Sequence, residues 1–201
     1  MATKRPSNPL RTKTDVLNVQ DYLRYKSKRN YTIFILGITT GYRAGDLVKL
    51  QVRDIKEALK YKEFVIKEGK KYNNANVKDK NRKPRRVALI PSVEKILKEY
   101  IRDMKDYEYI FQSRKGTNQP IGVQAISKAL REAGEYFGLY NITAHSMRKT
   151  YAYKIWIESD KDVLVVKELL GHSSIEETKL YLGLDREEYR NYTMKLNDFV
   201  R

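Results

Sequence analysis

Two short segments hold the only two histidines of this 201-residue chain, and each histidine has a chemically useful neighbour. His145 precedes Arg148 by three residues in TAHSMRKTY, a spacing that puts both side chains on one face of a helix. His172 lies in LLGHSS, nine residues before Tyr181. Arginine offers a planar fork of donors to phosphate oxygens, histidine exchanges a proton near neutral pH, and an activated phenol is a nucleophile. The combination is typical of phosphoryl transfer.

Arg43 is a further candidate because the sequence places it in a tight turn. An apolar helix is predicted from Arg29 to Thr40, Gly41 ends it, and a short helix begins at Ala44. An arginine in such a turn contributes little to a core, and it can direct its guanidinium into a cleft. Each candidate also has a simpler interpretation, namely a solvated turn arginine, a surface histidine, or one phenol among 16 tyrosines.

The charge balance indicates the partner. The chain carries 41 lysines and arginines against 25 acidic residues, a net charge of +16. Such an excess repels itself unless a polyanion is bound, and DNA carries one negative charge per roughly 1.7 Å of helix axis. Charge alone does not separate DNA from RNA, or a binding protein from an enzyme. Nucleic acid is therefore the expected partner.

Composition also excludes several classes of protein. The chain has no cysteine, so it has no disulfide, no thiolate zinc site and no thiol nucleophile. No run approaches the roughly 18 apolar residues of a membrane span, and the basic start MATKRPSNPLRTKT lacks the apolar core of a signal peptide. We expect a cytoplasmic protein with no membrane partner.

The pattern along the chain predicts an α+β fold that is mainly α-helical. Strand-like segments at 62–70 and 85–91 flank a stretch rich in lysine and asparagine, which predicts a small antiparallel β-sheet or hairpin with a basic tip. The remainder from residue 123 is helical. The predicted organisation is a disordered basic arm at 1–13, one domain at 14–184 and a helical tail at 185–201.

Three motifs and their order resemble one protein family. The segments TGYRAGDLVKL, HSMRKTYA and LLGHSSIEETKLYLGL are similar to the catalytic domain of the tyrosine recombinases, the phage integrase family. The resemblance runs from about residue 27 to 184. It implies that 14–184 is an integrase-type catalytic domain. Most members of the family carry an N-terminal core-binding domain in front of it, and this chain departs from that pattern, so we expect no separate core-binding domain here.

The resemblance also assigns roles to the candidate residues. Arg43 and Arg148 would clamp the oxygens of the scissile phosphate, and His145 would be the general acid or base. His172 would hydrogen-bond the phosphate or orient the site. Tyr181 would attack the phosphorus, giving a 3′-phosphotyrosine link and a free 5′-hydroxyl. No cofactor and no metal are implied, since the bond energy is kept in the phosphotyrosine.

A catalytic lysine on the hairpin completes the family's set. It protonates the leaving 5′-oxygen, and the end of the first strand favours Lys70 for this role. Lys71, Lys78 and Lys80 stay open as alternatives. Asp46 either orients a catalytic group or simply opens the short helix.

The function predicted from these observations is site-specific DNA recombination. The expected partners are double-stranded DNA and further copies of the chain, as a dimer or tetramer on DNA, with no small-molecule substrate. A non-catalytic DNA-binding accessory factor of the same fold is one alternative. A DNA-relaxing enzyme resembling type IB topoisomerases is another.

Overall fold

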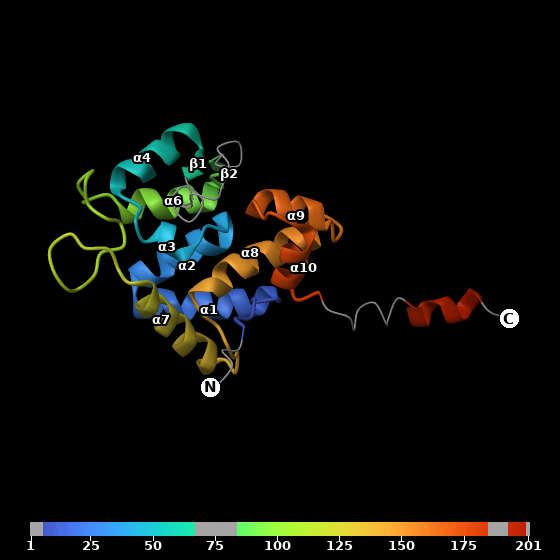
Figure 1. Cartoon of the computed structure of the whole chain (residues 1–201). Helices are drawn as coiled ribbons and strands as arrows, with labels where there is room; N and C mark the ends of the chain where they lie inside the picture. Colours follow the sequence, from blue (N-terminus) through green and yellow to red (C-terminus); the bar gives the residue numbers. More distant parts are fainter. Residues whose placement is uncertain (1–5, 67–83, 185–192, 200–201) are drawn as a thin grey trace. The chain divides into compact units, whose positions relative to one another are not determined.

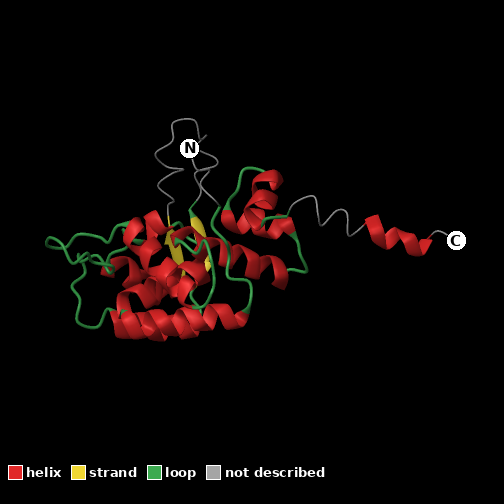
Figure 2. Cartoon of the chain, turned by 90° about the horizontal axis from the view of Figure 1, so that it is seen from below, coloured by secondary structure: helices red, strands yellow, loops and turns green. Residues whose placement is uncertain are grey.

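The computed structural model describes residues 6–66, 84–184 and 193–199. They belong to two compact units, one ending at Tyr151 and the other beginning at Ala152. Most of the described residues are helical, and the sheet has only two strands, so the predicted fold class is confirmed (Figure 2). The boundary between the units falls inside the region 14–184 that the sequence predicts as one domain.

The first unit is organised around one buried helix. α2 (Lys28–Thr40) is enclosed along most of its length, because its sequence is apolar on nearly every face. α1 (Lys13–Lys26) lies beside α2 (Figure 1). The other helices that begin in this unit are α3 (Ala44–Leu47), α4 (Val52–Tyr61), α6 (Pro91–Tyr100), α7 (Val123–Tyr136) and α8 (Ala144–Glu158), the last of which continues into the second unit. The sequence analysis assigns no element to the segment that forms α4.

The hairpin base is fastened to the end of α2. β1 (Glu63–Ile66) and β2 (Arg85–Ala88) pair antiparallel, as predicted. The hydroxyl of the buried Tyr42 lies 3.2 Å from the carbonyl oxygens of both Phe64 and Arg85. One phenol therefore bridges the two strands and ties them to the turn that follows α2.

The segment before α1 differs from the disordered arm expected over residues 1–13. Leu10 is buried, and its amide donates to Thr150 Oγ1 at 2.9 Å. The amide of Asn8 donates to the carbonyl of Asn141 at 3.1 Å. Thr12 caps α1 by accepting from the amide of Asp15. Asn141 and Thr150 lie far along the sequence, so residues 6–12 form an ordered strap on the first unit.

The second unit contains two short helices of eight residues each, α9 (Val163–Leu170) and α10 (Ile175–Leu182). Asp162 caps the first and Ser174 caps the second. Each helix ends at a glycine in the left-handed conformation. Of the predicted helical tail, the structure describes a 3₁₀ helix at Lys195–Phe199, while 185–192 lie outside the described residues.

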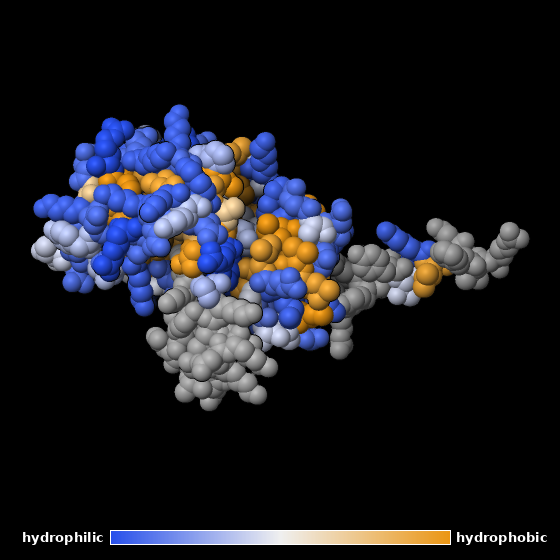
Figure 3. All heavy atoms as spheres, turned by 90° about the horizontal axis from the view of Figure 1, so that it is seen from above, coloured by the Kyte–Doolittle hydropathy of each residue, from blue (hydrophilic) through white to orange (hydrophobic). Residues whose placement is uncertain are grey.

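Hydrophilic residues predominate on the face shown in Figure 3, with apolar residues gathered in patches among them. None of the helices in the described ranges is long and apolar enough to cross a membrane.

Candidate active site

The turn after α2 requires a glycine and thereby fixes the backbone next to Arg43. Gly41 has φ +62°, and a Cβ built there would lie 2.3 Å from Cδ1 of Tyr151. A side chain at this position would clash with an aromatic ring and strain the backbone. Two residues later, Arg43 is the N-cap of α3 and is partly exposed. The sequence prediction of an arginine in this turn is confirmed.

Arg148 is buried in the first unit although it carries a charge. It is only 2% exposed, and its Nη1 donates to the carbonyl of Gly41 at 2.7 Å. That carbonyl stands at the C-terminal end of α2, where the helix dipole is negative and favours a cation. A carbonyl satisfies the donor without cancelling the charge of the guanidinium.

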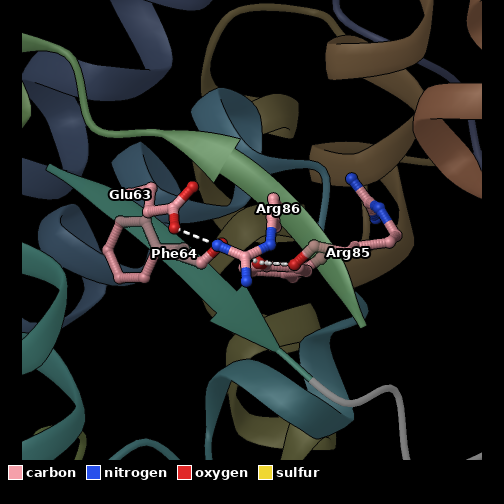
Figure 4. Close-up of polar contacts among 5 residues, drawn as sticks. Glu63, Phe64, Arg85 and Arg86 are labelled. Carbon is pink, nitrogen blue, oxygen red and sulfur yellow. Dashed lines mark hydrogen bonds and ion pairs between the residues drawn. The ribbon is translucent and has the colours of Figure 1, made fainter. Parts of the chain in front are cut away.

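Arg85 is the residue that the sequence analysis missed. Its Nη1 donates to the same Gly41 carbonyl at 3.1 Å, and its Nη2 donates to the carbonyl of Thr40 at 2.9 Å. The neighbouring Arg86 leaves β2 in a different direction, toward Glu63 (Figure 4). The only signal in the sequence is the alternation of a strand, which predicts that one of the two arginines faces inward.

His145 lies on α8 one turn before Arg148, as the sequence predicts, and it is exposed at the surface. Two causes lower the pKa of its imidazole to about 4. The first is partial burial of the ring, and the second is the repulsion of nearby cations, namely Lys149, Arg148 and Arg43. The ring is neutral at pH 7 and can accept a proton.

Two further residues of α8 respond to the same concentration of charge. Burial and then the positive charge of Arg11 lower the pKa of Lys149. Burial raises the pKa of the Tyr151 phenol, while Arg85 and Arg148 act in the opposite direction. The first unit thus gathers several cations around the N-terminal half of α8.

The second unit brings His172 and Tyr181 together. Their ring centroids are 5.0 Å apart with an interplanar angle of 67°, an edge contact. Nδ1 of His172 lies 3.0 Å from Oγ1 of Thr178. Gly171, at φ 64°, turns the chain between α9 and α10 and places the histidine at their junction.

The candidates therefore fall into two sets. Arg43, His145 and Arg148 lie together in the first unit, and His172 and Tyr181 lie together in the second. Lys70 lies outside the described residues, and so do its alternatives Lys71, Lys78 and Lys80. Asp46 occupies the first turn of α3, a position that favours an acidic side chain.

A cluster of cations beside a neutral histidine, and a second histidine against a tyrosine, suit a reaction at a phosphate. The family model for the phage integrase family matches residues 12–188. The chain belongs to the phage integrase family. The resemblance found in the three motifs is confirmed.

Similar proteins of known sequence carry recombinase names. The probable integrase/recombinase YoeC of Bacillus subtilis is 32% identical over 182 residues, which are 90% of this chain and 92% of YoeC. The tyrosine recombinase XerC of Neisseria gonorrhoeae is 33% identical over 55% of this chain and 36% of its own length. The tyrosine recombinase XerA of Pyrococcus furiosus is 24% identical over 92% of this chain and 61% of its own length. The chain thus spans nearly all of YoeC, but less than two thirds of these Xer proteins.

Solved structures show the same fold. A crystal structure of XerA recombinase aligns with a TM-score of 0.67 at 23% identity, over 95% of this chain and 66% of that one. XerH site-specific recombinase bound to its difH substrate gives a TM-score of 0.65 at 19% identity, over 96% of this chain and 55% of that one. The fold is that of the tyrosine recombinase catalytic domain, and the family makes the chain a tyrosine-type DNA strand transferase.

Proposed function

We propose that this chain is a site-specific DNA recombinase that cuts and rejoins DNA through a 3′-phosphotyrosine on Tyr181. The two sets of residues, one in each unit, act on a single scissile phosphate. The observation that supports this most directly is the buried guanidinium of Arg148, held beside Arg85 on one carbonyl and next to the neutral ring of His145.

A bound phosphate fits this arrangement. Two guanidinium groups that share one carbonyl oxygen repel each other, and a bound phosphate opposes that repulsion. In the transition state of phosphoryl transfer, negative charge accumulates on the non-bridging oxygens. Donors that are already in place when the charge develops need no reorganisation, which is how such sites lower a barrier. Arg148 fills this role from the first unit, together with Arg43.

The proposed reaction balances without an outside energy source. The phenol oxygen of Tyr181 attacks the phosphorus, and its proton passes to the neutral imidazole of His145. The bond from phosphorus to the 5′-oxygen breaks, and Lys70 protonates that oxygen. Attack by the 5′-hydroxyl of a second strand then reverses these steps on a new partner. One phosphodiester is exchanged for another, so the proposed reaction consumes neither ATP nor a metal ion.

Double-stranded DNA is the proposed partner, and a dimer or tetramer on DNA is the proposed assembly. The net charge of +16 supports binding to a polyanion. Among the proteins of similar structure, XerH is bound to its difH substrate and lambda integrase is a dimer bound to a core site. We place the reaction in the cytoplasm.

A covalent trap tests the proposal. DNA crosslinked to the protein in cells is sequenced to find the target, and that target is rebuilt as a nicked suicide substrate. Wild type is expected to form a DNA adduct that survives a denaturing gel, and Tyr181→Phe is expected to form none. Tyr140→Phe is the matched control, because Tyr140 is 71% exposed and belongs to neither set of residues.

The alternatives give different results in the same assay. An adduct that persists in Tyr181→Phe means that the nucleophile is another residue. Tight DNA binding with no adduct on any substrate favours the accessory factor. Relaxation of supercoiled plasmid without recombinant products favours the relaxing enzyme.

A further inference from the structure

Thr178 lies on α10 one turn before Tyr181, and none of the roles above involves it. Its side chain is fully enclosed, with 0% exposure. Oγ1 lies 3.0 Å from Nδ1 of His172 and 3.2 Å from the carbonyl oxygen of Ser174. All of these residues belong to the second unit. One buried hydroxyl therefore stands between a carbonyl and a candidate active-site histidine.

The proton count of this contact fixes the direction of both hydrogen bonds. The carbonyl of Ser174 can only accept, so it takes the single hydroxyl proton of Thr178. The lone pairs of Oγ1 are then directed to Nδ1, which must carry a proton in order to donate. In the opposite arrangement the hydroxyl donates to a bare Nδ1, and two oxygen atoms face each other at 3.2 Å with no proton between them. That arrangement is unfavourable in an enclosed place.

We propose that Thr178 is a positioning residue that holds His172 in the tautomer with its proton on Nδ1. Nε2 is then the nitrogen that takes up and releases a proton. The neutral ring accepts at Nε2, and the protonated ring donates from Nε2 to a phosphate oxygen. In the other tautomer, the neutral ring has no lone pair at Nε2 and cannot accept a proton there. The part that concerns catalysis rests on the function proposed above.

The backbone supports the same arrangement. The amide of His172 donates to the carbonyl of Lys167 at 3.0 Å, which closes the end of α9. The residue is thus fixed by its backbone amide at the end of α9 and by Nδ1 on α10, while its ring makes an edge contact with the ring of Tyr181, at 5.0 Å between centroids. Thr178 and Tyr181 are three residues apart on one helix. The contact that sets the tautomer therefore also sets the position of the histidine relative to the nucleophile.

Nitrogen NMR on the free protein tests the tautomer without any DNA. The chain has only two histidines, so ¹⁵N-labelled histidine gives two ring systems, and His145→Gln identifies the remaining one as His172. Spectra are recorded with rising pH until the ring is neutral. In wild type and Thr178→Ser we expect the proton on Nδ1. In Thr178→Val, which keeps the volume and removes the hydroxyl, we expect it to move to Nε2.

Two results would overturn the proposal. One is a neutral wild-type ring with its proton on Nε2, which decides the question even if no variant folds. The other is a Thr178→Val protein that keeps the proton on Nδ1. Thermal unfolding separates packing from hydrogen bonding, because a packing role makes Thr178→Ser the worse variant and the proposed role makes Thr178→Val the worse one.

Adduct formation on the suicide substrate supplies the catalytic readout. Thr178→Val is expected to slow the reaction about 10- to 100-fold, by analogy with partners that orient metal-bound histidines, with Thr178→Ser close to wild type. Thr39→Val is the control, since Thr39 makes the same kind of back-bond, to Ile35 at 2.7 Å. An unchanged rate in Thr178→Val contradicts the catalytic part. If wild type forms no adduct, the proposed function fails, while the NMR result still decides the tautomer.

Discussion

The cationic site and the candidate nucleophile are carried by different kinds of structure in this chain. The cationic site of the first unit rests on α2, a helix of 13 residues that is buried along most of its length, and on carbonyl oxygens at its end. Tyr181, in the second unit, lies on α10, a helix of eight residues whose Leu180 is 81% exposed. Short helices depend on packing for their stability. Electrostatic preorganisation is therefore placed in a rigid core, and the nucleophile on a lightly built helix.

The largest effect is expected from the buried arginine of the rigid site. Arg148→Lys keeps the charge but loses the planar fork, so adduct formation should fall on the order of 10²–10³-fold, as for other preorganised donors. DNA affinity should change much less. Arg53→Lys on α4 is the control, because Arg53 is exposed and the hydrogen bond from its backbone amide to the carbonyl of Asp106 does not involve the side chain. A loss confined to affinity, with an unchanged cleavage rate, would contradict this role.

The turn beneath that site should be intolerant of any side chain. Gly41→Ala combines a left-handed backbone with a Cβ 2.3 Å from the Tyr151 ring, and we expect it to lower the free energy of unfolding by about 2–4 kcal/mol. Denaturant titration measures the change. Gly45→Ala is the comparison, since its Cβ would meet nothing within 4 Å. Equal stability of the two variants would show that the turn is not rigid.

A smaller effect is expected at the second guanidinium. Arg85→Met leaves the Gly41 carbonyl to Arg148 alone, and adduct formation should fall about tenfold, which corresponds to about 1.4 kcal/mol. Arg86→Met, one residue further along β2, removes an exposed ion pair with Glu63 and should change little. If the two variants behave alike, Arg85 has no special part in the site.

The smallest effect concerns the pH dependence of DNA binding. In the protein without DNA, the imidazole of His145 has a pKa of about 4, and a neighbouring phosphate raises this pKa. Between these two pKa values the complex holds more protons than the free protein, so the affinity rises as the pH falls, by at most about tenfold per pH unit. Fluorescence anisotropy at several pH values measures this slope. His145→Gln should flatten it, and an unchanged slope in that variant would assign the proton to another group.

The sequence predicts the local parts of this structure and misses the parts that depend on distant contacts. Gly41, the turn at Arg43 and the shared helix of His145 and Arg148 follow from residue type and spacing. Arg85 does not, because an arginine next to a basic loop is expected at the surface. Only tertiary packing buries it. The lowered pKa of His145 likewise depends on burial and on cations that folding brings near.

The ordered strap before α1 is missed for the same reason. Its sequence is basic and polar, and the partners that order it stand at residues 141 and 150. The sequence of the first dozen residues does not indicate these partners. The junction at His172, by contrast, depends on local signals, because a glycine and a capping serine mark the two helix ends beside it.

The hydrogen bond from Leu10 to Thr150 joins residues 140 positions apart, and this spacing has a consequence for biosynthesis. The start of the chain leaves the ribosome long before its partner is made, and contacts of such long range form late. The strap can settle only after α8 has been translated, which is also when Arg148 reaches its carbonyl. The strap and the buried side chain of Arg148 therefore reach their final positions in the same late step.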